Sequence, residues 1–550
     1  MASLEPITGV LGRRRAAHLL RRTSYRYTKS KVDQLAAMSV SEALDDLLQY
    51  RPLQLDQPLF DNPQTTAIEL QPWCLPPGLP LPDEDFRLRR RLLTWWTHEA
   101  FSDAGATHKL TFFFHQFMTV DAISYQSVHF FDHLALLRWG ALGNFKKLAM
   151  KMVLDNCMLR YLNNQQNTKS NPNENFAREF FELFTIGKGP QIGPGDYTNY
   201  TEDDIKAAAR LFTGFRTRQQ RDIIDSETGI PSGQLQFGQH DTGSKTFSDK
   251  FQNTVIPGAT NAAGMMVELQ TFVDMVFAQA ETARTTCRRL YRFFVGRAIT
   301  PEIESDIIEP LAATFRNSGY EMKPTLERLL SSKNFYDEDD ANQHDEIFGS
   351  LIKSPLELTG HALSFFDIAI PSPTEAPQQH HTAFYAQGVL DRMFLAAGLN
   401  LFMPTDVAGY PAYYQEPDYN RAWFNSSTII ARYKLPAMLI TGRRQIGSNP
   451  NVSIGIKLNL APWLRDSGVV SDPHDPYVVV KDLLEYMLPE PISGDRFNYF
   501  YVQTFLDGLP PADWAYEWDE YLQTGNAGEV ALMLERLVTA IMYSPEYQTF

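Results

Sequence analysis

The sequence predicts a mainly α-helical protein, large and multi-helical, with one small β-hairpin or long-loop insertion near residues 215–260. Apolar residues recur at helical spacing through most of the chain, and clusters of proline and glycine separate these stretches. Strands and helices do not alternate along the chain, which argues against a parallel α/β sheet. The 550 residues are 43% hydrophobic and 12% aromatic, a composition that supports a large ordered core.

An N-terminal helical region is expected over residues 1–140. The predicted helices in it cover residues 13–22, 29–37, 41–49, 86–102, 109–119 and 127–140. Ser39 or Ser41 can cap the third of these helices. Eight prolines between residues 52 and 82 remove backbone donors and exclude a long helix, so residues 51–85 are predicted to form a loop that wraps around the helices.

A central helical core is expected over residues 141–367, and a C-terminal helical region over residues 368–550. The predicted helices cover residues 144–157, 264–294, 301–317, 323–331, 355–366, 423–432 and 530–544. In the insertion, helical spacing gives way to glycine, aspartate, serine and alternating apolar residues. Residues 371–381, which contain prolines and histidines, are the predicted linker. No repeat of fixed period occurs, so a solenoid is not expected.

Composition argues against several functional classes. The net charge of −15 opposes a general nucleic-acid-binding surface, which needs clustered lysine and arginine. Cys74, Cys157 and Cys287 are too few and too dispersed for a disulfide framework or a zinc cluster. The glycine-rich phosphate-binding motifs, the dinucleotide fingerprint and the nucleophile elbow are all absent from the sequence, so nucleotide-binding and α/β-hydrolase functions lose their usual support.

The sequence also bears on location. No apolar run approaches the roughly 18 residues of a membrane-spanning helix, so no transmembrane segment is expected. The first residues lack the apolar core of a secretory signal. As written, the chain is expected to be cytoplasmic, and the alternative is a periplasmic or exported protein whose signal has been removed.

The densest polar signature begins at Asn173 and forms a predicted helix, which we call the Asn-Glu-Asn helix (residues 173–187). At about 100° per residue, one face of this helix is polar and the other is apolar. The polar face carries Glu174, Asn175, Arg178, Glu179 and Glu182, and the apolar face carries Phe176, Ala177, Phe180, Phe181, Leu183 and Phe184. The apolar face is expected to dock, which leaves the polar face to bind. The candidate binding residues are Asn173, Glu174, Asn175, Arg178 and, from a later loop, Asn425.

Two interpretations of this polar face remain open. In the first, Glu174, Arg178 and Glu182 form a structural ladder of i,i+4 pairs, each stabilising the helix by about 0.2–0.5 kcal/mol. In the second, Glu179 and Glu182 turn toward Asp203 or Asp204 of the next helix. Such a carboxylate cluster would bind a divalent cation or perform acid–base catalysis.

Histidines provide further candidates. His240 and Asp241 lie in a glycine-containing loop, where they could share a metal or orient a general base, although an Asx-turn explains the same residues. His129 and His133 have the i,i+4 spacing of zinc ligands but lack the glutamate of a metalloprotease helix, so a structural role is favoured. The candidate metal ligands are therefore His240, Asp241, Glu179 and Glu182.

The ordered set of motifs resembles the large bacterial family called domain of unknown function 1800. The motifs are Ala16-Ala-His-Leu-Leu-Arg-Arg, Phe113-Phe-His-Gln-Phe, the Asn-Glu-Asn helix, Asp204 with Ala208-Ala-Arg-Leu-Phe-Thr-Gly, His240-Asp241 with Lys245, Lys353-Ser-Pro-Leu-Glu357, Asn425-Ser-Ser and Ser544-Pro-Glu-Tyr-Gln. The resemblance spans nearly the whole chain and implies a mainly helical fold.

The resemblance also implies a functional neighbourhood. Members are often encoded beside domain of unknown function 1501, which looks related to sulfatases and alkaline phosphatases, and this suggests work on anionic or sulfated envelope material by analogy. Two positions depart from the family pattern. Where relatives usually show His-Pro before Thr-Ala-Arg, this chain has Gln279-Ala280-Glu281 before Thr282-Ala-Arg284, and Phe184 replaces a common histidine. If those histidines act as ligands or bases in relatives, this member has lost that chemistry.

Three hypotheses follow. The first is a binding or assembly protein that holds a protein partner or polymer, or a second copy of itself, through the Asn-Glu-Asn helix, the His240 loop and the loop at residues 405–414. The second is a metal-assisted hydrolase in which Glu179, Glu182 and Asp204 converge with His240 and Asp241 on a cation that activates water. The third is a redox protein with a flat aromatic pocket, lined by Trp95, Trp96, Tyr413, Tyr414 and Trp423.

Overall fold

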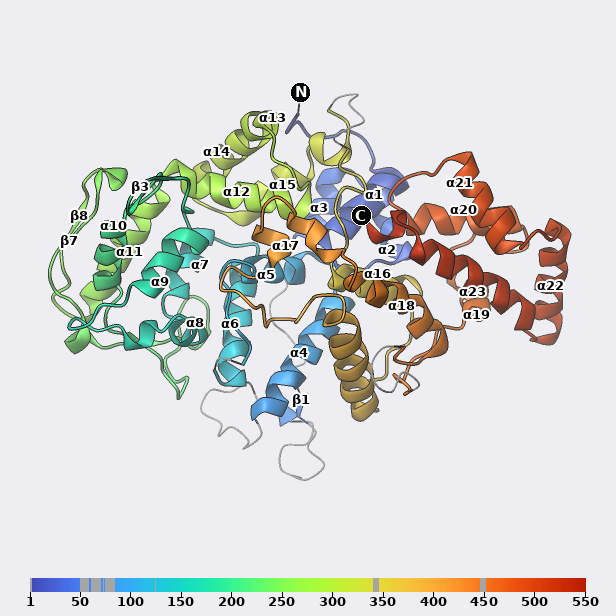
Figure 1. The fold of residues 1–550 in the computed structure, drawn as a ribbon, viewed down its shortest axis with the longest axis horizontal. Helices are drawn as coiled ribbons and strands as arrows, with labels where there is room; N and C mark the ends of the chain where they lie inside the picture. The colour runs from blue at the N-terminus through green and yellow to red at the C-terminus, as the bar shows by residue number, and fades with distance from the viewer. Residues whose placement is uncertain are drawn as a thin grey trace.

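The fold is mainly helical, as the sequence predicts (Figure 1). The computed structural model describes residues 2–49, 59–60, 71–72, 74, 85–123, 125–339, 346–445 and 452–550. Most of the predicted wrapping loop, residues 51–85, lies outside the described residues. Its described part includes two short strands, β1 (Leu59–Phe60) and β2 (Gln71–Pro72), which pair antiparallel.

The N-terminal region contains six helices among its described residues. They are α1 (Gly12–Thr23), α2 (Lys29–Ala36), α3 (Val40–Leu47), α4 (Asp85–Ser102), α5 (Thr107–His115) and α6 (Ser127–Gly140). Ser39 caps α3 in a reciprocal capping box with Glu42. Every residue of α5 is buried, so this short helix lies inside the molecule and not on its surface.

The central region continues the helical pattern. Its helices are α7 (Phe145–Met152), α8 (Asn156–Tyr161), η1 (Asn164–Gln166), α9 (Glu174–Glu179), η2 (Phe180–Phe184), α10 (Glu202–Leu211), α11 (Ala262–Phe277), α12 (Ala280–Phe294), α13 (Pro301–Ile303), η5 (Glu304–Ile308), α14 (Glu309–Asn317), α15 (Met322–Leu330) and η6 (Asn334–Tyr336). The Asn-Glu-Asn helix is therefore α9 followed by η2, a turn of π-helix.

The predicted β insertion near residues 215–260 is confirmed, although it forms two strand pairs and not one. β5 (Phe215–Arg216) pairs with β6 (Gln234–Leu235), and β7 (Lys245–Thr246) pairs with β8 (Val255–Ile256). Short 3-10 turns, η3 (Phe237–Gln239) and η4 (Asp249–Phe251), lie between these strands. A further pair, β3 (Gln191–Gly193) with β4 (Asp196–Tyr197), follows the Asn-Glu-Asn helix.

The C-terminal part of the chain adds α16 (Pro355–Phe365) and a long π-helix, η7 (Gln378–Phe394), which begins within the predicted linker and packs against α4. The remaining helices are α17 (Pro411–Tyr414), η8 (Tyr419–Trp423), α18 (Thr428–Thr441), α19 (Leu460–Ser467), α20 (Pro476–Met487), α21 (Gly494–Asn498), η9 (Tyr499–Phe505), α22 (Pro511–Thr524), α23 (Gly528–Tyr543) and η10 (Glu546–Gln548). Among the described helices, none combines the length and the apolar character that a bilayer crossing requires.

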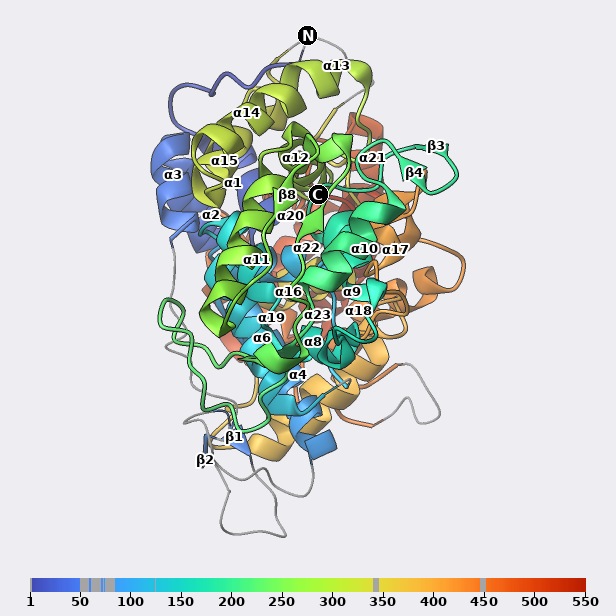
Figure 2. The same cartoon turned by 90° about the vertical axis from the view of Figure 1, so that its left-hand side faces the viewer.

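Segments distant in sequence meet at the centre of the molecule. In Figure 1 the central helices α8–α11 lie toward the left end, α20–α23 lie toward the right end, and α1, α5 and α16 lie between them. Figure 2 faces the left-hand side and shows α10 and α11 in front. Buried apolar side chains form one continuous cluster from Leu4 to Tyr547. This shared core brings α12, the Asn-Glu-Asn helix and the segment containing α17 and η8 to one place.

Candidate functional site

The first turn of the Asn-Glu-Asn helix has local structural roles. The Asn173 side chain accepts a hydrogen bond from the backbone N–H of Asn175 (3.0 Å) and so caps α9. The Asn175 side chain donates to the Leu162 carbonyl (3.2 Å). Asn425 acts in the same way, since its side chain accepts from the backbone N–H groups of Ser427 and Thr428. These predicted binding residues are engaged within the chain.

The charged face of this helix divides where α9 becomes η2. Arg178 donates two hydrogen bonds to Glu202 of α10 (2.7 and 2.8 Å) and lies 3.4 Å from Glu174. Glu182 instead accepts from the Tyr200 hydroxyl (3.1 Å). A π-helix bonds each amide to the carbonyl five residues earlier, so Glu182 no longer follows Arg178 at α-helical spacing. The predicted ladder is present only between Glu174 and Arg178.

Asp204, His240 and Asp241 lie apart from this face. Asp204 is buried, caps the start of α10 with Thr201, and accepts two hydrogen bonds from Ser248 (both 2.7 Å). Asp241 forms an ion pair with Arg210 (2.9 Å), and Arg210 lies about 9 Å further along α10 than Asp204.

His240 is held between two other groups. Its Nε2 lies 3.0 Å from the Glu268 carboxylate, and its Nδ1 lies 2.8 Å from the Thr213 carbonyl. Throughout the part of the chain that the structure describes, no three His, Cys, Asp or Glu side chains are placed to share a metal ion. The structure therefore does not bring Glu179, Glu182, Asp204, His240 and Asp241 together around one cation.

Glu179 differs from its neighbours on the helix. Its carboxylate is half-buried, and no described residue forms a hydrogen bond or an ion pair with it. Burial raises its pKa to about 7, and the nearby charges of Glu182 and Asp406 add to this rise, while Arg178 opposes it. Asp406 belongs to the loop at residues 405–414, so the charge of a second segment that the sequence singled out for binding acts on Glu179.

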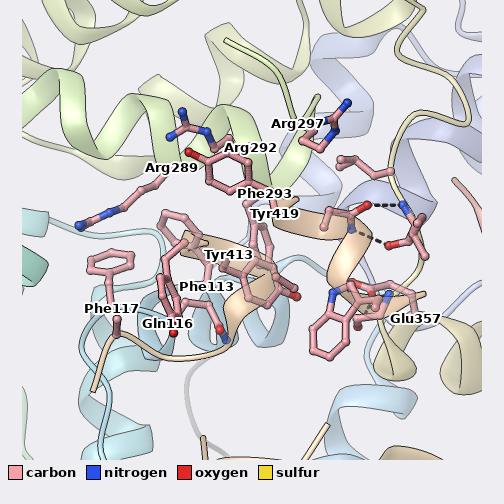
Figure 3. A pocket seen from close by; sticks show the side chains of 18 of the residues that line it. Phe113, Gln116, Phe117, Arg289, Arg292, Phe293, Arg297, Glu357, Tyr413 and Tyr419 are labelled. Carbon is pink, nitrogen blue, oxygen red and sulfur yellow. Dashed lines mark hydrogen bonds between the residues drawn. The ribbon is translucent and has the colours of Figure 1, made fainter. Parts of the chain in front are cut away.

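A pocket lies between the end of this helix and the loop at residues 405–414, and we call it the junction pocket (Figure 3). Leu183 at the end of η2 lines it, one helical turn after Glu179. Its volume is about 70 Å³. Aromatic side chains form a large part of its wall, among them Phe113, Phe117, Phe293, Tyr413, Tyr419 and Trp423. Their rings contact one another, with centroid distances such as 5.2 Å between Phe113 and Phe293 and 5.4 Å between Phe293 and Tyr413.

A glycine positions the loop that closes this wall. Gly409 has φ +89°, and a Cβ there would lie 2.3 Å from the backbone oxygen of Gln116. Only glycine allows this close approach without strain. The loop therefore lies directly on the chain after α5, and α17 follows it into the pocket wall.

Arginines of α12 and the turn after it form the charged part of the pocket. Arg289 donates to the Leu183 carbonyl and its guanidinium lies 4.5 Å from the centre of the Phe117 ring. Arg292 lies 4.5 Å from the centre of the Tyr419 ring. Arg297 donates to the Pro417 carbonyl (3.2 Å). None of the three forms an ion pair with a described carboxylate, and burial lowers the pKa of Arg289 to about 10.

The family assignment rests on the whole chain. A family model described as "Protein of unknown function (DUF1800)" matches residues 18–549. The chain belongs to this family. No curated protein and no solved structure matches the chain. Two of the motifs behind the resemblance to DUF1800 proteins, at residues 113–117 and 353–357, supply residues that line the junction pocket.

The two departures from the DUF1800 pattern have structural roles here. Phe184 is buried against Phe176 and Phe180, and Glu281 forms an ion pair with Arg288 (2.5 Å). Of the predicted flat aromatic pocket, Tyr413, Tyr414 and Trp423 do line the junction pocket, whereas Trp95 and Trp96 are buried elsewhere in the core.

Sequence reasoning missed Asp406 and the pocket arginines. A usable signal was present in α12, where Arg289 and Arg292 recur at i,i+3 directly before Phe293. The sequence could not show which arginines of α12 are paired, because their carboxylate partners come from several elements.

Proposed function

We propose that this protein is a binding or assembly protein that holds a partner, a protein segment or a polymer, at the junction pocket. The observation that carries this proposal is that Arg292, which lines the pocket, and Glu179, one helical turn before Leu183 of its wall, form no hydrogen bond or ion pair within the described residues. Polar groups that are buried or half-buried are normally hydrogen-bonded, so groups left unpaired are available to a partner. Arginine and aromatic residues are also the side chains most enriched among binding hot spots.

The family resemblance supplies the partner class for this proposal. A sulfatase-like protein of domain of unknown function 1501, or anionic envelope material, fits the arginine side of the pocket by charge. A second copy of this chain is the other candidate partner.

Site-specific photo-crosslinking tests the proposal. Tyr414 lines the pocket and is 38% exposed, so p-benzoyl-L-phenylalanine at position 414 should crosslink a discrete partner in the source cells. The same group at Tyr516, which is 66% exposed on α22, is the matched control. We expect a crosslinked species, identified by mass spectrometry, from position 414 that disappears when Arg292→Gln is added. Identical products from both positions would refute the proposal.

A second candidate is hydrolysis of anionic material with Glu179 as the proton-transferring group. A pKa of about 7 suits a general acid or base near neutral pH. A divalent cation would enter only with this candidate, as a cofactor that activates water. Product release from a sulfated or phosphorylated polymer by the wild-type protein, and its loss in Glu179→Gln, would favour this candidate over pure binding.

A further inference from the structure

We propose that the junction pocket is an oxyanion site that takes a phosphate or sulfate ester attached to a flat ring, with Arg292 as its principal anion-binding residue. This inference rests on the proposed function, because it names the chemistry of the group that the same pocket would hold. Four features of the pocket carry it: the division of the arginines on α12, the unfilled donors of Arg292, the buried cations behind the wall, and the pocket's size and shape.

The arginines of α12 fall into two sets. Arg284 forms an ion pair with Glu309 (2.7 Å), and Arg288 forms one with Glu304 (2.6 Å). Arg289 and Arg292, which line the pocket (Figure 3), have no such partner among the described residues. The chain has a net charge of −15, so carboxylates are abundant, yet among the described residues none lies at ion-pair distance from Arg289 or Arg292. The pocket therefore presents positive charge from a protein that is acidic overall.

Among the pocket arginines, Arg292 is the best candidate to bind an anion. Among the described residues its buried Nε has no hydrogen-bond partner, and its guanidinium carbon lies 4.5 Å from the centre of the Tyr419 ring. Glu416 and Glu304 act on it only from beyond ion-pair distance. Burial lowers its pKa, but a guanidinium keeps its charge in proteins. A half-buried guanidinium with an unpaired N–H is costly, and an oxyanion would bind its terminal N–H groups.

Buried cations behind the pocket add to its positive potential. Lys109, Arg432 and Arg22 are all almost completely buried. Lys353 is buried beside them, but burial lowers its pKa well below the ordinary value, so only the other three are counted as charges. Within the described residues, Glu357 is the single carboxylate at ion-pair distance from this group, 3.0 Å from the Lys109 amine. Arg22, Lys353 and Arg432 donate to backbone carbonyls. Glu357 also lines the pocket, so this excess of positive charge lies directly behind the wall, where low-dielectric surroundings strengthen its field.

The size and shape of the pocket limit the ligand. A volume of about 70 Å³ holds several water molecules, which is room for one tetrahedral oxyanion and not for a large ligand. The aromatic wall offers ring faces to whatever the oxyanion is attached to, and such faces stack on flat or sugar-like rings. The shared chemistry is therefore an oxyanion ester on a ring, and phosphate and sulfate esters are its two sources.

Calorimetric titration of the full-length protein with phenyl phosphate, phenyl sulfate and inorganic phosphate tests this inference. We expect saturable binding of at least one phenyl ester, tighter than that of inorganic phosphate. Arg292→Gln should weaken it about tenfold or more, the loss expected for one hydrogen bond to a charged group. Arg284→Gln removes the same charge from the same helix outside the pocket, and should change affinity by less than about twofold. The phenyl ester that binds more tightly shows whether the natural ligand carries a phosphate or a sulfate group.

Several outcomes would overturn the inference. One is that the wild-type protein shows no saturable binding of either phenyl ester at concentrations up to about 10 mM. Another is that the wild-type and Arg292→Gln proteins bind the phenyl esters with equal affinity. Equal affinity for inorganic phosphate and phenyl phosphate would overturn the role of the aromatic wall. Circular dichroism confirms folding of each variant, and Arg289→Gln provides a second test if Arg292→Gln does not fold. Crosslinking at Tyr414 without ester binding would refute this inference and leave the proposed function standing. Ester binding without a crosslinked partner would support this inference and refute the proposed function.

Discussion

Replacing Glu179 by glutamine should stabilise the protein at neutral and alkaline pH. Burial, with the charges of Glu182 and Asp406, raises the pKa of Glu179 from its ordinary 4.5 to about 7 in the folded protein. The folded state therefore holds the proton more tightly than the unfolded state. The stabilisation that the protonated Glu179 contributes is fully present below pH 4.5 and is lost as the pH rises through 7.

The magnitude follows from that pKa. A difference of this size corresponds to at most about 3 kcal/mol at pH 8. Because the carboxylate is only half-buried, solvent screening reduces the expected effect to about 1–2 kcal/mol. Glutamine keeps the shape of the side chain and removes the charge, so the free energy of unfolding of Glu179→Gln should exceed that of the wild type by this amount at pH 8. The two proteins should differ little near pH 5.

Urea unfolding followed by tryptophan fluorescence between pH 5 and pH 8 measures the effect. Glu202→Gln is the control of opposite sign, since hydrogen bonds from Arg178 lower the pKa of Glu202 and that variant should lose stability at neutral pH. Parallel stability profiles for Glu179→Gln and wild type, within about 0.5 kcal/mol across the range, would refute the assignment of Glu179 as a half-buried, unpaired carboxylate.

Three further predictions concern stability. The buried Asp132 carboxylate lies 2.7 Å from the Arg221 guanidinium. Arg221→Gln would leave this carboxylate buried without its partner and should lower the free energy of unfolding by about 3–5 kcal/mol. A loss below about 1 kcal/mol would contradict the buried pair. Gly409→Ala forces a Cβ against the Gln116 carbonyl and should lower the free energy of unfolding by about 1–3 kcal/mol. It should also weaken binding of the phenyl esters, and unchanged binding would show that the loop does not shape the pocket. Asp204→Ala removes one half of the capping box of α10 and should lower the free energy of unfolding by about 1–2 kcal/mol in the same assay. If the variant instead lost a bound metal and kept its stability, Asp204 would be a metal ligand.

Much of the fold follows from local features of the sequence. Helix positions come from apolar periodicity, and helix starts come from caps such as Ser39 and Thr201, which act within three residues of their own position. The amphipathic nature of the Asn-Glu-Asn helix was also predictable, and its phenylalanines do dock on the core. The π-helical turn after Glu179 was not predictable, because helical periodicity assumes a constant 100° per residue and a π-turn breaks it.

The candidate site depended on tertiary structure. The sequence by itself determined the mainly helical class, the family and Glu179 as a candidate residue. Only the tertiary structure decided that the charge of Asp406 acts on Glu179 and that Asp204 and His240 are engaged elsewhere. It also decided that Arg292 has no carboxylate at ion-pair distance among the described residues. The physical reason is that an ionisable side chain acquires its role from the charges and burial around it. Those surroundings come from segments that meet only when the common core forms.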